Sequence, residues 1–180
     1  SELERILTEI EKRIEEHERR IKENSKRMKE IVDDHERKVE EVLRRIRKLL
    51  RDLEEMVKRG ELDEDTAEKV KRDIDKLLEE ARRHSERVKR ELDKSNEDLR
   101  RHSKKVIDDI RRLVEEVRRR GVERREDLEK VARDVEKRLE DANRENEKSS
   151  RELKRRLDEL DKKLEEEARR IKKAIDDKTR

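Results

Sequence analysis

The sequence predicts an all-α protein, a long antiparallel up-down-up three-helix bundle that is nearly straight or weakly supercoiled. Charged residues make up 62% of the chain and are almost balanced in sign, and proline is absent. Apolar residues recur every three or four positions, which together with this composition is typical of long helices and coiled coils. The mean period is about 3.5 to 3.6 residues, and a period near 3.6 predicts little supercoiling.

Two glycines divide the chain into three segments of nearly equal length. Gly60 and Gly121 each follow a run of basic residues. Cations in a last helical turn followed by glycine are typical of a helix C-terminus. Short connections make neighbouring helices antiparallel, so the expected order is up, down, up. The helices are predicted at residues 2–59, 63–120 and 124–178 of a single bundle formed by residues 1–180.

The first two helix starts carry capping signals. Ser1 and Glu4 have the spacing of a capping box, in which each side chain binds the other's backbone N–H group. Asp63 is a candidate N-cap for the second helix. Leu62 precedes this cap and Ala67 follows it at the spacing of a hydrophobic staple. These signals support helix starts next to residues 1 and 63.

Polar residues interrupt the apolar stripe in the middle of each predicted helix. In the second helix, a His-Ser dipeptide occurs at 84–85 and again at 102–103, with a Ser-Asn pair midway at 95–96. The two dipeptides are 18 residues apart, which is about five turns at 3.6 residues per turn. Both imidazoles are therefore expected on the same side of the helix.

Folding the chain at its glycines brings these polar residues together. A tight turn at Gly60 pairs residues whose numbers sum to about 120, because the two helices run antiparallel. A second turn near Gly121 brings the third helix parallel to the first, with numbers about 125 higher. The first fold places three pairs opposite each other, namely His17 with Ser103, Ser25 with Ser95, and His35 with Ser85.

The expected result is three polar layers in an otherwise aliphatic core. A buried polar group without a partner costs about 1–3 kcal/mol, so a wrong register that leaves several unpaired is disfavoured. The correct register is expected to satisfy them together, as a core Asn fixes the register of a coiled coil. The first layer comprises His17, His102, Ser103 and Asn143; the second comprises Asn24, Ser25, Ser95, Asn96, Asn146, Ser149 and Ser150; the third comprises His35, His84 and Ser85, with Asp161 as a candidate further member.

These polar positions on Leu/Ile/Val stripes, together with a surface saturated in Glu, Lys and Arg, resemble a known class. The chain resembles de novo designed helical bundles, generated parametrically, whose cores contain buried hydrogen-bond networks. The resemblance covers the whole chain and concerns its style rather than one motif. It implies a structural scaffold without a natural biochemical function. Spectrin-type three-helix repeats are similar in topology, but their aromatic core residues are missing here.

Catalytic and metal-binding chemistry find little support in the sequence. A serine and a histidine come together in the first and third layers, as nucleophilic catalysis requires. However, a solid bundle offers no cleft, and Asp161 is the only candidate for the third member. Two histidines in a layer fall short of the three protein ligands that zinc normally needs. We therefore predict no enzyme activity, no metal site and no cofactor.

Composition also limits the partners that we expect. A net charge of +3 spread over mixed charges is a poor nucleic-acid footprint. No apolar run approaches the roughly 20 residues that span a bilayer, so we expect no membrane partner. We expect a monomer. Additional apolar residues beside the stripes can instead form a face for a second copy or a fourth helix, and these are Ile6, Ile31, Leu43, Leu50, Val57, Leu78, Ile107 and Val114.

The alternative function is a pH-responsive or self-assembling helical module driven by buried histidines. A buried neutral histidine resists protonation, so its pKa in the folded state lies below the unfolded value of about 6.5. The unfolded chain then binds more protons, and stability is lost as pH falls below that value. This hypothesis requires all four histidines to be buried.

Overall fold

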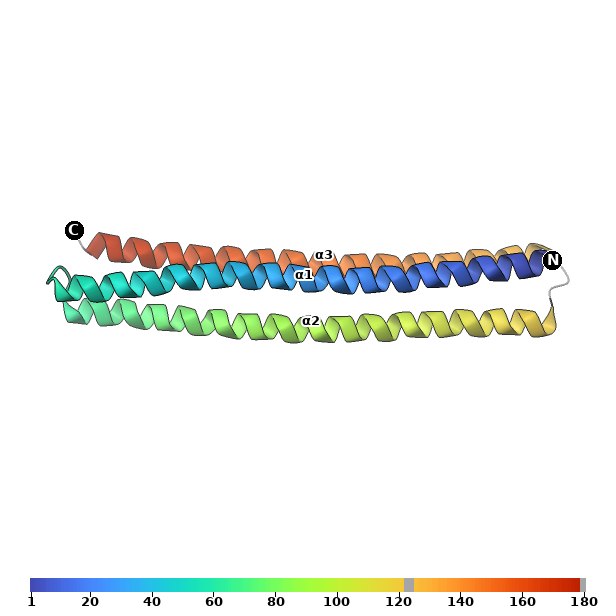
Figure 1. The fold of residues 1–180 in the computed structure, drawn as a ribbon, viewed down its shortest axis with the longest axis horizontal. Coiled ribbons are helices and arrows are strands. Elements are labelled where there is room, and N and C mark those ends of the chain that lie inside the picture. The colour runs from blue at the N-terminus through green and yellow to red at the C-terminus, as the bar shows by residue number, and fades with distance from the viewer. Residues whose placement is uncertain (122–124, 179–180) are drawn as a thin grey trace. The chain divides into compact units, whose positions relative to one another are not determined.

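The chain folds into a three-helix bundle, which confirms the predicted fold class. A computed structural model describes residues 1–121 and 125–178, with side chains at 1–121 and 126–177. Figure 1 shows the three helices, coloured from the N-terminus to the C-terminus. The bounds lie within one residue of the predicted ones, and the predicted start at residue 124 lies outside the described residues. The helices are α1 (Glu2–Lys58), α2 (Glu64–Arg120) and α3 (Arg125–Lys178).

Glycine ends α1 because the chain adopts a left-handed backbone conformation there. Gly60 has a φ of 72°, which residues with a Cβ rarely adopt. The Gly60 N–H donates to the carbonyl of Val57 at 3.1 Å, and the Glu61 N–H donates to the carbonyl of Met56 at 3.0 Å. This pair of hydrogen bonds is a Schellman motif, which satisfies carbonyls that the end of a helix leaves free. The turn reverses the chain within a few residues.

The predicted N-caps of α1 and α2 are present. The Ser1 hydroxyl accepts a hydrogen bond from the Glu4 N–H at 3.3 Å. Asp63 Oδ1 accepts one from the Thr66 N–H at 2.7 Å, which makes Asp63 the N-cap of α2. Leu62 is buried on the other side of this cap, within the apolar core. The turn between α1 and α2 is therefore specified at both ends, by Gly60 after α1 and by Asp63 before α2.

The bundle divides into two compact units, each built from segments of all three helices. The first unit contains residues 1–29 and 92–153, and the second contains residues 30–91 and 154–180. In the second unit the tight turn at Gly60 makes α1 and α2 antiparallel. The prediction of one domain over residues 1–180 stays a prediction.

Each unit has its own apolar cluster. Leu7, Ile10 and Ile14 of α1 pack in the first unit against Ile107, Ile110 and Val114 of α2 and Val135 and Leu139 of α3. In the second unit the cluster joins eleven buried residues. Burial of these side chains stabilises each unit, at about 25 cal/mol for each Å² of apolar surface removed from water. The cluster residues of the second unit are Val42, Ile46, Leu53, Leu62, Ala67, Val70, Ile74, Leu77, Ala168, Ile171 and Ile175.

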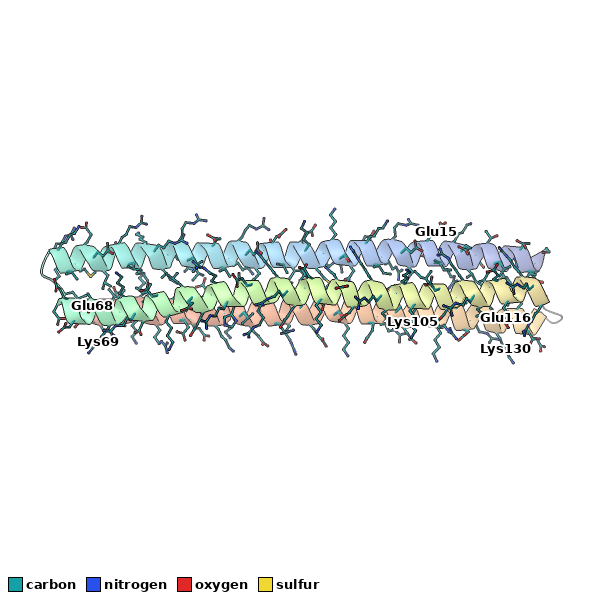
Figure 2. The ribbon with its side chains drawn as sticks, turned by 90° about the horizontal axis from the view of Figure 1, so that it is seen from below. Glu15, Glu68, Lys69, Lys105, Glu116 and Lys130 are labelled. Atoms are coloured by element: carbon teal, nitrogen blue, oxygen red, sulfur yellow. The ribbon has the colours of Figure 1, made fainter. Side chains whose placement is uncertain are left out.

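Charged side chains occupy the outer faces of the helices. Figure 2 shows Glu15 pointing away from the neighbouring helices, and Lys105 and Lys130 of the same unit are also exposed. Glu68 and Lys69 are exposed in the second unit. Ion pairs such as Arg83–Glu79 link residues one turn apart on these faces, and each contributes only about 0.3–0.5 kcal/mol. The outer surface therefore stabilises the bundle little, and the specificity has to come from the core.

Candidate functional site

His17 and Asn143 form a polar pair between α1 and α3 in the first unit. His17 is 1% exposed, and its Nδ1 lies 2.6 Å from Asn143 Oδ1. Because an amide oxygen only accepts hydrogen bonds, Nδ1 is the donor, and Nε2 of the neutral ring carries the lone pair. Nε2 is buried and has no hydrogen-bond partner among the described residues. The ring is therefore held at one nitrogen and unsatisfied at the other.

Burial lowers the pKa of His17 below its ordinary value of 6.5, because the charged imidazolium would lose its water shell. The hydrogen bond with Asn143 opposes this effect, since it also favours the charged ring. The positive charge of Arg20 acts in the same direction as burial. His17 is therefore a neutral imidazole at neutral pH.

A second group of polar contacts lies around Asn24, also in the first unit. Asn24 Nδ2 donates to the backbone carbonyl of Asn146 at 3.2 Å and lies 3.7 Å from Met28 Sδ. The Ser150 hydroxyl donates to Asn24 Oδ1. Its oxygen also lies 3.4 Å from the Asn146 carbonyl, one turn earlier in α3. Asn24 is thus bonded through both ends of its amide, and both bonds to another helix go to α3.

Several buried polar atoms of the predicted layers have no hydrogen-bond partner among the described residues. They include both amide atoms of Asn146, Oδ1 of Asn96 and Oγ of Ser103. The expectation that one register satisfies all of these groups together is wrong for these atoms. Helix axes in bundles lie about 8–10 Å apart, so a side chain as short as serine rarely spans the gap unless its partner is long. Ser103 is 2% exposed and is not bonded to His17.

His35 and Asp161 form the polar contact of the second unit. His35 is buried, and its Nδ1 contacts Asp161 Oδ1 as an ion pair if the ring is protonated. The two atoms are close but are not aligned as a hydrogen bond, and His35 Nε2 also has no partner among the described residues. Lys38 Nζ lies 3.9 Å from the other oxygen of Asp161. The carboxylate therefore sits between a buried imidazole and an exposed ammonium group.

Two of the four histidines are not in the core, which corrects the sequence prediction. His84 and His102 are both exposed. Each precedes by one residue a serine on the inner side of α2, because Ser85 is half-buried and Ser103 is buried. One residue turns the helix by about 100° at 3.6 residues per turn, which carries each imidazole out to solvent. A pH response driven by four buried histidines is therefore wrong.

The remaining predicted residues lie at intermediate depth. None of these side chains is fully exposed, and none is as deeply buried as that of His17. Two contacts were missed by the sequence analysis, namely Met28 beside Asn24 and Lys38 beside the Asp161 carboxylate. Spacings of three and four residues on α1 could have indicated both. The half-buried members of the predicted layers are Ser25, Ser85, Ser95, Asn96, Asn143, Ser149 and Asp161.

A shallow groove of about 200 Å³ lies beside the His17–Asn143 pair, between α1 and α3 of the first unit. Its other lining residues are mostly charged, including Arg13, Arg20 and Glu136. The pair therefore borders a groove whose lining is mostly charged.

Comparisons with family models, curated proteins and solved structures find no match to this chain. Within residues 1–121 and 125–178, no helix is long and apolar enough to cross a membrane. The same residues contain no group of three or more His, Cys, Asp or Glu side chains placed to hold a metal ion. The candidate site is therefore a set of buried polar contacts between the helices of a three-helix bundle.

Proposed function

We propose that this chain is a designed, monomeric structural scaffold without enzymatic activity, in which buried polar pairs set the register of α1 against α3. One repeated spacing carries the proposal. In three contacts between these helices, each of which includes a buried side chain, the residue numbers of the partners differ by 126. The contacts are His17 with Asn143, Asn24 with Ser150, and His35 with Asp161. The Asn24 amide also donates to the carbonyl of Asn146, which is 122 residues away.

A common spacing matters because an apolar stripe tolerates a shift by one heptad. Leucine, isoleucine and valine then still meet one another, so the hydrophobic effect discriminates weakly between registers. Moving α3 by seven residues would place Leu157 opposite Asn24 and Ala168 opposite His35. Each buried polar group left unpaired in this way costs about 1–3 kcal/mol. The polar pairs therefore penalise the shifted register.

The α1–α3 pair depends more on polar contacts for its register than the α1–α2 pair does. α1 and α2 are joined by a tight turn, whose hydrogen bonds at Gly60 already fix where α2 begins. α1 and α3 are not consecutive in the chain, so no turn sets their register directly. Among the described residues, the interhelical hydrogen bonds made by polar side chains of the predicted layers join α1 to α3; two connect side chains and the third goes to the backbone carbonyl of Asn146.

Packing of six of the eight additional apolar residues supports a monomer; the other two, Ile31 and Leu43, are half-buried outside the two clusters. Ile6 packs against the apolar cluster of the first unit. Leu50, Val57 and Leu78 pack against that of the second. Ile107 and Val114, which the sequence also offered as a face for a fourth helix or a second copy, are buried members of the first cluster. These residues stabilise the bundle itself.

The proposal predicts that an apolar core is more stable but less specific. In a variant carrying His17→Leu, Asn24→Leu and His35→Leu, we expect a higher midpoint of thermal unfolding, because buried polar groups are replaced by apolar ones. We also expect more than one set of backbone amide peaks in the NMR spectrum, because heptad-shifted registers are no longer penalised. The measurement is heat unfolding together with an amide correlation spectrum.

A Ser25→Ala variant is the matched control. Ser25 is half-buried on α1 and belongs to none of the three pairs, so one set of peaks is expected. A single, well-dispersed set of peaks from the triple variant would show that apolar packing alone sets the register, and the proposed role of the polar pairs would be wrong.

A further inference from the structure

We propose that His17 makes the first unit acid-sensitive: protonation of its imidazole opens the packing of the first unit, while the second unit, where His35 contacts a carboxylate, stays closed. This inference goes beyond the scaffold role, because it assigns a response to one residue. It does not depend on how register is set. The two buried imidazoles differ in their surroundings, and this difference carries the proposal.

At His17 a second proton would form an N–H group that has no hydrogen-bond acceptor in the described part of the chain. Nδ1 already donates to Asn143 Oδ1, so the new proton binds Nε2. Nε2 is buried and has no acceptor among the described residues. Protonation would therefore create a buried charge with an unsatisfied donor, which is among the costliest groups that a core can contain.

The carboxylates around His17 are already paired with arginines. On α1, Glu16 pairs with Arg20 at 3.2 Å, and Glu18 pairs with Arg111 of α2 at 3.5 Å. Glu18 favours a positive charge on His17, but that charge would have to compete with these guanidinium groups.

The carboxylates of α3 beside the groove are paired in the same way. Glu136 lies 2.5 Å from Arg13, and Glu140 lies 3.9 Å from Arg144. The exposed His102 of α2 also lowers the pKa of His17 through its electrostatic effect, so it disfavours a positive charge on His17. Each of these four carboxylates of α1 and α3 is therefore already paired with an arginine.

His35, like His17, has a buried Nε2 without a partner among the described residues, and it differs from His17 in its charged neighbour. Its Nδ1 contacts Asp161 of α3, so a positive charge on the ring would have a negative partner. The neighbouring cations are Lys38, which lies 3.9 Å from Asp161, and Lys89 of α2, which pairs with Glu36 at 3.1 Å. Breaking a buried pair is far costlier than completing one. Protonation of His35 therefore does not require the second unit to open.

The sign of the pH effect follows from the lowered pKa of His17. The unfolded chain, with a histidine pKa near 6.5, binds more protons than the folded chain at pH values below this. The contribution of neutral His17 to stability is therefore complete above about pH 6.5 and declines as pH falls toward the folded pKa.

Hydrogen exchange followed by mass spectrometry tests the proposal on the whole chain. Exchange is compared at about pH 7.5 and pH 5, after correction for the intrinsic rates. We expect peptides containing residues 10–24, 99–110 and 136–150 to lose protection at the lower pH. Peptides containing residues 39–53 and 70–81 should keep theirs. His17→Leu should abolish the loss, and His102→Gln, which removes an exposed histidine of the same unit, should preserve it.

Three outcomes would overturn the proposal: unchanged protection of the first unit in acid, equal loss in both units, or loss that persists in His17→Leu. An NMR titration of the four imidazoles in the unmodified chain serves if that variant does not fold. His17 should then titrate below the ordinary histidine value of about 6.5, and a midpoint at or above that value would refute the proposal. The register experiment contains no acid step, so the two proposals can fail separately.

Discussion

Asn146 shows what a single buried polar residue costs this core. The residue is 4% exposed, and neither its Oδ1 nor its Nδ2 has a hydrogen-bond partner among the described residues. Its backbone carbonyl, in contrast, accepts a hydrogen bond from Asn24 Nδ2. An amide buried without partners costs about 1–3 kcal/mol. At this position the polar side chain weakens the bundle, whereas the backbone beside it helps to hold Asn24.

Replacing Asn146 with leucine should therefore stabilise the protein. We expect Asn146→Leu to raise the free energy of unfolding by about 1–3 kcal/mol, because the unpaired amide is removed and its carbonyl remains available. Urea unfolding at neutral pH measures the change. Asn143→Leu is the matched comparison and should give no such gain, since it removes the partner of His17. An Asn146→Leu variant no more stable than the parent would show that its amide is satisfied in solution.

A few residues specify the helix ends through hydrogen bonds to backbone groups close to them in sequence. Asp63 accepts a hydrogen bond from the Thr66 N–H at the start of α2. This backbone hydrogen bond lowers the pKa of Asp63 below its ordinary value of 3.8, because it favours the charged carboxylate. The cap therefore contributes stability above the ordinary pKa and loses it as pH falls through the lowered value.

An asparagine in place of Asp63 separates the cap from its charge. The asparagine side chain is a good N-cap that does not titrate, so the Asp63→Asn variant should lose less stability than the parent between about pH 6 and pH 2. The check is urea unfolding of both proteins across this range. Parallel pH profiles would mean that titration of Asp63 does not contribute to stability.

The whole bundle was predictable from sequence because its signals are long and repetitive. Two glycines and an apolar period over more than fifty residues per helix determine three helices, and the structure places their ends within a residue of the prediction where they are described. The spacing between α1 and α3 was predicted as about 125 from loop geometry, and the pairs around His17 and Asn24 show 126.

Burial of individual polar residues was less predictable, because neighbours in sequence point in different directions. His102 and Ser103 form one dipeptide, yet the first is exposed and the second is buried. The apolar period locates the centre of the inner face of a helix. It does not decide which of two adjacent residues at the edge of that face is buried, and these differ by roughly 100° of rotation. Whether a buried oxygen meets a donor depends on sub-ångström shifts in position, which a pattern of residue types does not contain.

The coupling between Asn24 and Ser150 tests the central claim, that buried polar pairs hold α1 against α3, most directly. Urea unfolding of the parent, Asn24→Ala, Ser150→Ala and the double variant gives the interaction energy of the pair. We predict a favourable coupling of about 0.5–3 kcal/mol, the range of residues in one hydrogen-bond network. The same cycle for Asn24 and Ser103, which share no hydrogen bond, should give additive effects. Additive effects for Asn24 and Ser150 would contradict the account.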